Sequence, residues 1–283
     1  MCRFALYLGS GITVSSLVTE PSNSLIHQSF DNQERTEPLN GDGFGIAWYV
    51  PEIDRQPALF RSVSPAWSDQ NLRHLARVTH SGCILAHVRA ATPGLPVHQL
   101  NCHPFGWHRF AFMHNGIIGG FRHIRRRILE RLSDEAFDMI AGSTDSEHLF
   151  ALFVDQYRRL EGQEPLERMA RALAEAIAEV EEIRRDAGVD EPSQFNLAVA
   201  DGHRAVVTRF TSGDPAQANS LYVHRGRRYV CEDRNCRMIE PGEEGGAVIV
   251  SSERLSEDPG WVRVEVNDLV TVSEDLVVDS RPL

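Results

Sequence analysis

Cys2 directly follows the initiator Met1, and this position gives a cysteine two reactive groups at once. Methionine is normally removed when the next residue is small, so processing would leave a thiol and a free α-amine on Cys2. The amine has a reference pKa of about 7.7–8.0, so part of it is neutral near pH 7. A neutral amine can accept the thiol proton and later return it to a leaving amine. A cysteine at position 2 usually has no catalytic role. Motifs elsewhere in the chain must therefore indicate whether Cys2 is a nucleophile.

Arg89 ends an apolar run that has the pattern of a buried strand. A buried arginine is costly unless it meets an anion, and its guanidinium fork suits a carboxylate in bidentate geometry. Thr92, three residues later, could hydrogen-bond the same anionic group. A structural ion pair within the protein is the alternative explanation for Arg89.

Asn115 and Gly116 follow another apolar run, at 110–113. An Asn-Gly pair is usually just a turn. The side-chain amide of Asn115 and the backbone N–H of Gly116 could also point to one spot. Two convergent donors of this kind form an oxyanion hole.

Asp145 lies in a segment, 142–147, that has the pattern of a helix N-terminus. Residues of this segment can cap the helix. Asp145 could also bind an ammonium group, and Arg89 with Asp145 would then hold the two charges of an α-amino acid. The glycine-rich loop 40–45 lacks the ending of a phosphate-binding loop. Its expected role is to let the backbone pass close to the site.

Strands must position these groups, and the apolar pattern predicts them in both halves of the chain. The predicted strands cover residues 3–8, 44–50, 58–61, 83–89, 110–113, 195–200, 205–210, 221–224, 247–250, 262–266 and 269–272. Asp201-Gly202 lies between two of them and predicts a hairpin turn.

Helices are predicted only in the middle of the chain, over residues 121–132, 144–160 and 165–186. Each has an apolar stripe at helical spacing, which indicates packing against a core. Strands, then helices, then strands predict an α+β layered sandwich rather than a parallel βαβ fold. The whole chain, 1–283, is expected to form a single domain.

The 283 residues carry a net charge of −11, which disfavours nucleic-acid binding. We see no signal peptide and no apolar stretch of about 20 residues, so a cytoplasmic location without membrane contact is expected. The five cysteines are odd in number and irregularly spaced, so they predict no disulfide framework. Cys231 and Cys236 lack the second Cys or His pair of a zinc site. We expect no metal and no cofactor.

Taken in order, these motifs resemble those of the class II glutamine amidotransferases, within the N-terminal nucleophile hydrolase superfamily. The matching segments are Met-Cys, Asp-Gly-Phe-Gly, His-Val-Arg-x-x-Thr, Asn-x-His-Pro-Phe, His-Asn-Gly and Thr-Asp-Ser-Glu, from residue 2 to residue 147. The segment 251–253, Ser-Ser-Glu, resembles a late strand of the family. The fold that the resemblance implies is a four-layer αββα sandwich.

The resemblance also implies a role for each residue that matches a motif. Cys2 would be the nucleophile, and Asn115 and Gly116 would form the oxyanion hole. The substrate-binding set would be Arg89, Thr92, His103 and Asp145. The reaction would cleave a γ-glutamyl amide, in glutamine or another γ-glutamyl compound, through a γ-glutamyl thioester.

Two departures from the family pattern concern the surroundings of the nucleophile. Leu39-Asn40 stands where better-known members have an arginine, and Ala90 stands where they have an aromatic residue. The chain is more similar to the compact branch that includes the γ-glutamyl hydrolase of ergothioneine biosynthesis. Three functions stay open: a glutaminase with a separate synthase partner, a self-sufficient γ-glutamyl hydrolase, and a catalytically silent ligand-binding protein. The sequence does not predict the oligomeric state.

Overall fold

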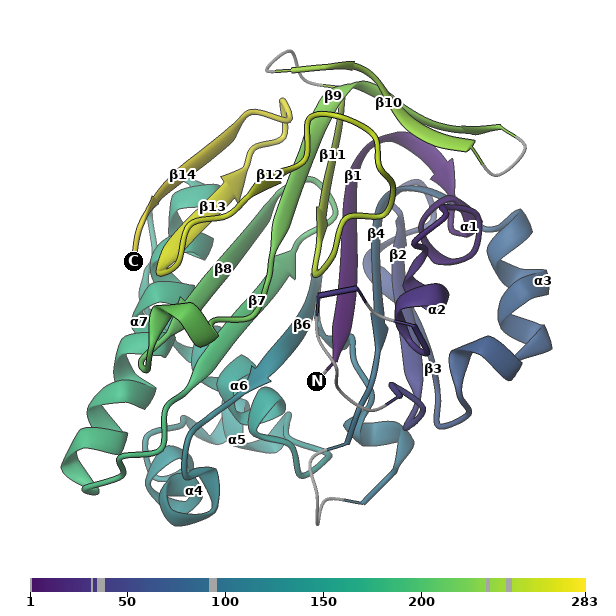
Figure 1. Ribbon diagram of the computed structural model, residues 1–283. Coiled ribbons are helices and arrows are strands. Elements are labelled where there is room, and N and C mark those ends of the chain that lie inside the picture. The colour runs from purple at the N-terminus through teal and green to yellow at the C-terminus, as the bar shows by residue number, and fades with distance from the viewer. Residues whose placement is uncertain (1, 32, 35–38, 92–95, 233–234, 243–245) are drawn as a thin grey trace.

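The computed structural model describes residues 2–31, 33–34, 39–91, 96–232, 235–242 and 246–283. Within these residues two antiparallel sheets lie face to face, and helices cover the outer face of each (Figure 1). The layers therefore follow the order helix, sheet, sheet, helix, and the expected α+β αββα sandwich is confirmed.

The first sheet has the strand order β10-β9-β11-β1-β4-β2-β3, with β12 beside β9. Its strands are β1 (Arg3–Thr13), β2 (Phe44–Val50), β3 (Asp54–Ser62), β4 (His80–Val88), β9 (Tyr222–Glu232), β10 (Asn235–Pro241), β11 (Ala247–Ser251) and β12 (Val262–Arg263). The second sheet has the order β14-β13-β8-β7-β6-β5. Its strands are β5 (Phe105–Trp107), β6 (Phe110–Ile117), β7 (Gln194–Ala200), β8 (Ala205–Thr211), β13 (Asp268–Val272) and β14 (Val278–Pro282).

The helices fall into two groups, one for each sheet (Figure 1). Those on the side of the first sheet are α1 (Ser15–Val18), α2 (Leu25–Gln28) and α3 (Gln70–Val78). Those on the side of the second sheet are α4 (Phe121–Leu129), α5 (Asp134–Asp138), α6 (Asp145–Arg159) and α7 (Pro165–Asp186). No helix of the described residues combines the length and hydropathy needed to cross a bilayer.

The period of two along the strands decides which side chains lie between the sheets. In β1, Phe4 and Leu6 belong to the apolar cluster between the sheets, whereas Tyr7 packs toward the helices of the first sheet. In β6, Met113 lies between the sheets and Phe112 packs against α6 and α7. Each sheet thus buries both faces, one against helices and one against the other sheet.

Most predicted elements are present, and β2 and α7 have the predicted bounds. The β7–β8 hairpin turns at Asp201-Gly202, where the Asp201 carboxylate accepts the N–H groups of His203 and Arg204. The short helices α1 to α3 were not predicted. In α3 only Leu72 and Ala76 are buried, so its sequence carries little of the apolar stripe on which the prediction relied.

The expectation of no disulfide framework needs one correction. Cys231 and Cys236 form a disulfide that joins directly opposite residues of β9 and β10. The antiparallel pairing of β9 with β10 brings the sulfurs together. The sequence predicted only residues 221–224 of this pair, because the rest is polar. Cys2, Cys83 and Cys102 are free thiols.

Candidate active site

The nucleophile candidate lies at one edge of the first sheet, where β1 begins and β4 ends. Arg3 pairs with Val88, so Cys2 and Arg89 extend neighbouring antiparallel strands at the same edge. The alternation that turns Phe4 toward the second sheet also turns Cys2 that way. Asn115 follows Met113 by two residues in the facing strand β6 and shares its orientation. The fold therefore collects all three groups between the sheets.

The Cys2 thiol is partly buried, and its sulfur lies 3.6 Å from the carbonyl oxygen of Ala90. Burial raises the pKa of the thiol, while the Ala90 carbonyl and the charges of Arg89 and Arg3 lower it to a smaller extent. A thiol with a raised pKa rests in the protonated form near neutral pH. Its use as a nucleophile therefore requires a base that removes the proton.

Arg3 and Glu253 form a buried ion pair, with Arg3 Nε 2.8 Å from Glu253 Oε1. Arg3 also donates from its guanidinium to the carbonyl oxygen of Cys2, at 3.0 Å. The other oxygen of Glu253 accepts the backbone N–H of Gln33 at 2.9 Å. These contacts fix the backbone of Cys2 from the C-terminal half of the chain. Removing one partner of a buried pair typically costs about 3–5 kcal/mol.

Asn115 is buried, and its side chain contacts Ser252, which directly follows β11 of the first sheet. Its side-chain amide lies 3.4 Å from the hydroxyl oxygen of Ser252, and that hydroxyl also accepts the N–H of Phe4 at 3.0 Å. The N–H of Ser252 in turn donates to the carbonyl oxygen of Phe4. An amide NH₂ has two hydrogens, so one remains for an oxyanion. Ser252 therefore links the start of β1 to the predicted oxyanion donor.

Arg89 is 3% exposed, yet no carboxylate of the described residues lies within 4.0 Å of its guanidinium. Within the described part of the chain, its side chain makes one hydrogen bond, a long contact of 3.4 Å to the carbonyl oxygen of Asp42. An isolated buried charge is expensive. The structural ion pair considered for Arg89 is absent among the described residues, and the guanidinium is free to take an anion.

The glycine-rich loop fixes the backbone on both sides of Arg89. Asp42 donates its N–H to the carbonyl oxygen of Arg89, and the N–H of Arg89 donates to Gly43. The Asp42 carboxylate also accepts the N–H of Ala91 at 2.8 Å. At Gly45, where the loop enters β2, a Cβ would collide with the carbonyl oxygen of His103, so the backbone passes close to this residue.

Three buried histidines lie close together near the catalytic edge, the edge of the first sheet where β1 begins and β4 ends. The rings of His87 and His103 are 4.3 Å apart, and His87 Nε2 lies 3.2 Å from the carbonyl oxygen of His114. Burial lowers the pKa of His87 to about 3 and lowers the pKa values of His103 and His114. All three are neutral near pH 7. The predicted pocket residue His103 is thus a neutral ring that packs between His87 and Phe105, whose ring centroid lies 4.5 Å away in a tilted arrangement.

Asp145 begins α6 and binds the backbone just after β6, the strand that contains Asn115. Its two carboxylate oxygens accept the N–H of Ile118 and the N–H of Ser146, both at 2.8 Å. Ile118 is two residues beyond Gly116, so Asp145 orients the end of β6. The Ser146 hydroxyl also donates to the carboxylate, at 3.3 Å. A carboxylate has about four acceptor positions, so these three contacts leave room for one further donor. Helix capping itself falls to Thr144, whose hydroxyl accepts the N–H of Glu147.

The structure therefore brings Cys2, Arg89 and Asn115 to one edge, with Asp145 joined to it through the end of β6. Thr92 lies outside the described residues. Sequence reasoning missed the roles of Arg3, Ser252 and Glu253. The available signal was the polar Ser-Ser-Glu segment directly after the apolar residues 247–250.

A scan against protein-family models matches residues 14–280 to the family described as glutamine amidotransferases class-II. The chain belongs to the class II glutamine amidotransferases. The matched residues of this amidotransferase begin after Cys2, so the family match does not include the nucleophile candidate.

Individual relatives agree with the family. The chain is 37% identical to the probable glutamine amidotransferase DUG3 of Saccharomyces cerevisiae over 98% of this chain and 83% of the relative. It is 28% identical to a gamma-glutamyl-hercynylcysteine sulfoxide hydrolase of Mycobacterium tuberculosis, covering 97% of this chain and 94% of the relative. A solved glutamine aminotransferase class-II domain protein from Silicibacter pomeroyi superposes with a TM-score of 0.67 at 29% identity, covering 100% and 99% of the two chains.

Proposed function

We propose that this amidotransferase cleaves a γ-glutamyl amide through a thioester on Cys2, after removal of Met1. The observation that carries the proposal is the buried Arg89, which has no carboxylate partner among the described residues. Arg89 lies at the same sheet edge as a thiol and a buried amide donor. A γ-glutamyl group has an α-carboxylate for Arg89 and an α-ammonium for Asp145.

The chemical steps follow from the groups present. The α-amine of Cys2 takes the thiol proton, and the thiolate attacks the γ-carbonyl carbon. The Asn115 side-chain amide and the Gly116 N–H stabilise the negative oxygen of the tetrahedral intermediate. The C–N bond breaks, the leaving nitrogen takes the proton from the α-ammonium, and a γ-glutamyl thioester remains. Water then attacks the thioester, which releases glutamate and returns the thiol.

Arg89, Asp145, His103 and Thr92 are proposed to bind the glutamate part of the substrate. The neutral histidines support this assignment, since they add no positive charge that would compete with Arg89 for the carboxylate. Asp145 already holds two backbone N–H groups, so its position is fixed before substrate arrives. A preorganised carboxylate loses little entropy when an ammonium binds.

Water is the acceptor that we propose, which makes the protein a self-sufficient γ-glutamyl hydrolase. The support is the hydrolase relative, 94% of which aligns with this chain. The alternative is a glutaminase that passes ammonia to a separate synthase, and the relative described as a probable glutamine amidotransferase favours it. We also propose that residues 1–283 form one domain and that the protein is cytoplasmic, as the sequence predicts.

A substrate panel tests the proposal and separates its two forms. Glutamate release is measured with purified protein on glutamine, a γ-glutamyl dipeptide and a γ-glutamyl anilide. The proposal predicts glutamate from at least one of them, with no release by Cys2→Ala protein. A hydrolase works on the dipeptide or anilide without a partner, whereas a glutaminase subunit prefers glutamine. Equal release by Cys2→Ala and wild-type proteins would contradict the assignment.

A further inference from the structure

The end of the β9–β10 hairpin holds a second cysteine cluster, remote from the catalytic edge. Cys231 and Cys236 are directly opposite each other in the hairpin register, and their sulfurs are bonded. Tyr222, at the start of β9, pairs with Ser251 next to the catalytic edge, while Cys231 lies near the other end of this strand. The cluster therefore belongs to a different region of the sheet from Cys2.

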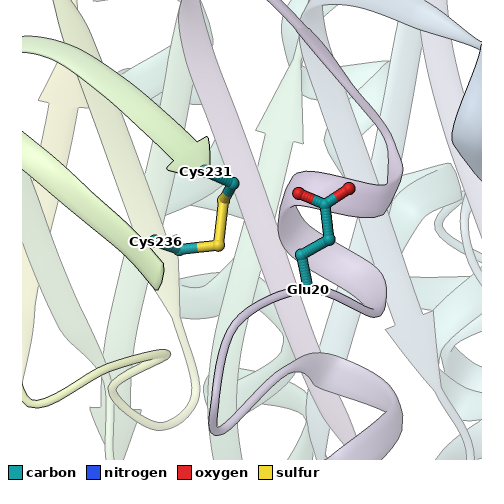
Figure 2. A group of neighbouring side chains, drawn as sticks. All are labelled: Glu20, Cys231 and Cys236. Carbon is teal, nitrogen blue, oxygen red and sulfur yellow. A yellow bond between two sulfur atoms is a disulfide. The ribbon is translucent and has the colours of Figure 1, made fainter. Parts of the chain in front are cut away.

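Glu20, from the segment after α1, completes the cluster. One oxygen of its carboxylate and the two cysteine sulfurs all lie within 4.8 Å of one another. Figure 2 shows the S–S bond on the side of the hairpin that faces Glu20. The hydroxyl of Ser15 donates to Glu20 Oε1 at 2.5 Å, and the Cys231 sulfur lies 3.6 Å from the carbonyl oxygen of Ser16. The α1 segment thus holds the carboxylate beside the sulfurs.

Two thiolates and a carboxylate are ligands that zinc uses in proteins. Zn–S distances of about 2.3 Å and Zn–O distances of about 2.0–2.2 Å place tetrahedral ligand atoms about 3.6–3.8 Å apart. The three ligand atoms lie within 4.8 Å of one another, so opening of the S–S bond and a small shift of the side chains would bring them to that spacing. The sequence lacks a second Cys or His pair, which disfavoured zinc. The fold supplies the third ligand from a distant part of the chain.

We propose that the reduced Cys231–Cys236 pair and Glu20 bind one Zn²⁺ and that the disulfide is the metal-free, oxidised form of the same site. A dithiol reductant supplies two electrons and two protons: the S–S bond breaks to two thiols while the reductant forms its own disulfide. Zinc then replaces the two thiol protons, which are released. Water occupies the fourth position of the tetrahedron, as in open zinc sites.

The surroundings of the cluster suit a reversible site. Cys236 is 4% exposed and lies in the apolar cluster under the hairpin with Tyr229 and Met238, while Cys231 is partly exposed. Glu20 is partly exposed and lines an open cleft of about 500 Å³. In reducing compartments thiol pairs are kept reduced, so the metal form is the one expected there.

Binding would join the hairpin to the helical layer on the first sheet. The disulfide links only β9 to β10, whereas a zinc ion held also by Glu20 links both strands to the segment after α1. The oxidised and zinc-bound forms therefore hold the hairpin in different ways. The oxidised form leaves Glu20 bonded only to Ser15, within the described residues.

The full-length protein tests this site directly. Protein is reduced under nitrogen with a phosphine, which with one water per disulfide gives two thiols and a phosphine oxide and does not chelate zinc strongly. Co²⁺ is added first, then Zn²⁺ in competition with a chromophoric chelator. We expect one Co²⁺ per chain with a thiolate-to-cobalt absorption band, displaced by Zn²⁺. The untreated, oxidised protein should show no such band.

Variants separate this site from the catalytic thiol. Cys231→Ser/Cys236→Ser protein should lose the band, and Cys2→Ala protein should keep it. Glu20→Gln should weaken Zn²⁺ affinity about 10–100-fold or more, by analogy with the loss of groups that support a metal site. Glu175→Gln, on the remote helix α7, is the matched control and should bind as wild type.

Circular dichroism confirms that each variant is folded before titration. A reduced, folded wild-type protein that shows no thiolate-to-cobalt band would overturn the proposal. So would a band that disappears in Cys2→Ala protein, since the metal would then be at the catalytic thiol. Unchanged affinity in Glu20→Gln protein would remove the carboxylate from the site and overturn the three-ligand assignment.

Discussion

The side-chain amide of Asn115 lies 3.4 Å from the hydroxyl oxygen of Ser252, and through that hydroxyl it is tied to the backbone of Phe4. Phe4 is two residues from Cys2, so Ser252 connects the proposed oxyanion donor to the strand that begins beside the proposed nucleophile. Ser252 is 1% exposed, and its backbone pairs with Phe4 as well. We infer that Ser252 positions Asn115 without touching the substrate.

Ser252→Ala should lower kcat more than it raises KM. The change leaves the buried Phe4 N–H without its acceptor, which costs about 1–3 kcal/mol of folding free energy. It also frees the Asn115 amide from one of its contacts. Ser251→Ala is the matched control, because the Ser251 hydroxyl makes only a long contact of 3.4 Å to the Phe4 carbonyl oxygen. Steady-state kinetics and urea unfolding measure both effects, and equal kcat values in the two variants would contradict the positioning role.

Asn115→Ala should lower kcat about 10²–10³-fold with a small change in KM, as expected for the loss of one oxyanion donor. The double variant Asn115→Ala/Ser252→Ala should be no slower than Asn115→Ala alone. The reason is that Ser252 acts on turnover through the Asn115 amide. Additive losses of kcat in the double variant would show that Ser252 has a separate effect.

Arg89→Met should weaken substrate binding strongly without destabilising the protein. Arg89 is buried with no carboxylate partner among the described residues, so an apolar side chain of similar length removes an unpaired charge. Urea unfolding should give a midpoint equal to or above that of the wild type, while KM rises about 100-fold or more. A structural arginine would behave in the opposite way, since breaking a buried pair costs about 3–5 kcal/mol.

Acid should destabilise the fold through the buried histidines. The folded-state pKa of His87 is about 3, below the unfolded value of about 6.5, so the unfolded chain binds more protons between these values. This contribution to stability is complete above about pH 6.5 and is lost as the pH falls toward 3. Each such histidine adds a slope of about 1.4 kcal/mol per pH unit.

Unfolding free energies measured by urea from pH 7 to pH 4 check this slope. His87→Gln should have a shallower dependence than the wild type, whereas His123→Gln, at an exposed position of α4, should not. Equal slopes in wild-type and His87→Gln proteins would show that His87 does not drive the acid sensitivity.

Features that depend on the local sequence pattern could be predicted from the sequence. The apolar runs predicted strands over residues 3–8, 83–89 and 110–113, next to or including Cys2, Arg89 and Asn115. The layered fold also followed from the order of strands and helices. The long apolar stripe of α7 likewise predicted its bounds.

Contacts between distant segments could not be predicted in this way. Ser252 and Glu253 reach the N-terminus only because β11 pairs with β1, and strand order is not encoded in periodicity. Glu20 meets Cys231 and Cys236 for a similar reason, through the packing of the α1 segment on the β9–β10 hairpin. Arg89 looked equally suited to an ion pair until the structure showed its surroundings.

The central claim is that Cys2 is an N-terminal nucleophile, and intact-mass analysis with a glutamine-like electrophile tests it most directly. Protein from its native host is incubated with diazo-oxo-norleucine, and the labelled peptide is mapped. We expect a chain that lacks Met1 and carries one adduct on Cys2, with the buried Cys102 unlabelled. A chain that retains Met1, or an adduct on another residue with Cys2 free, would contradict the claim.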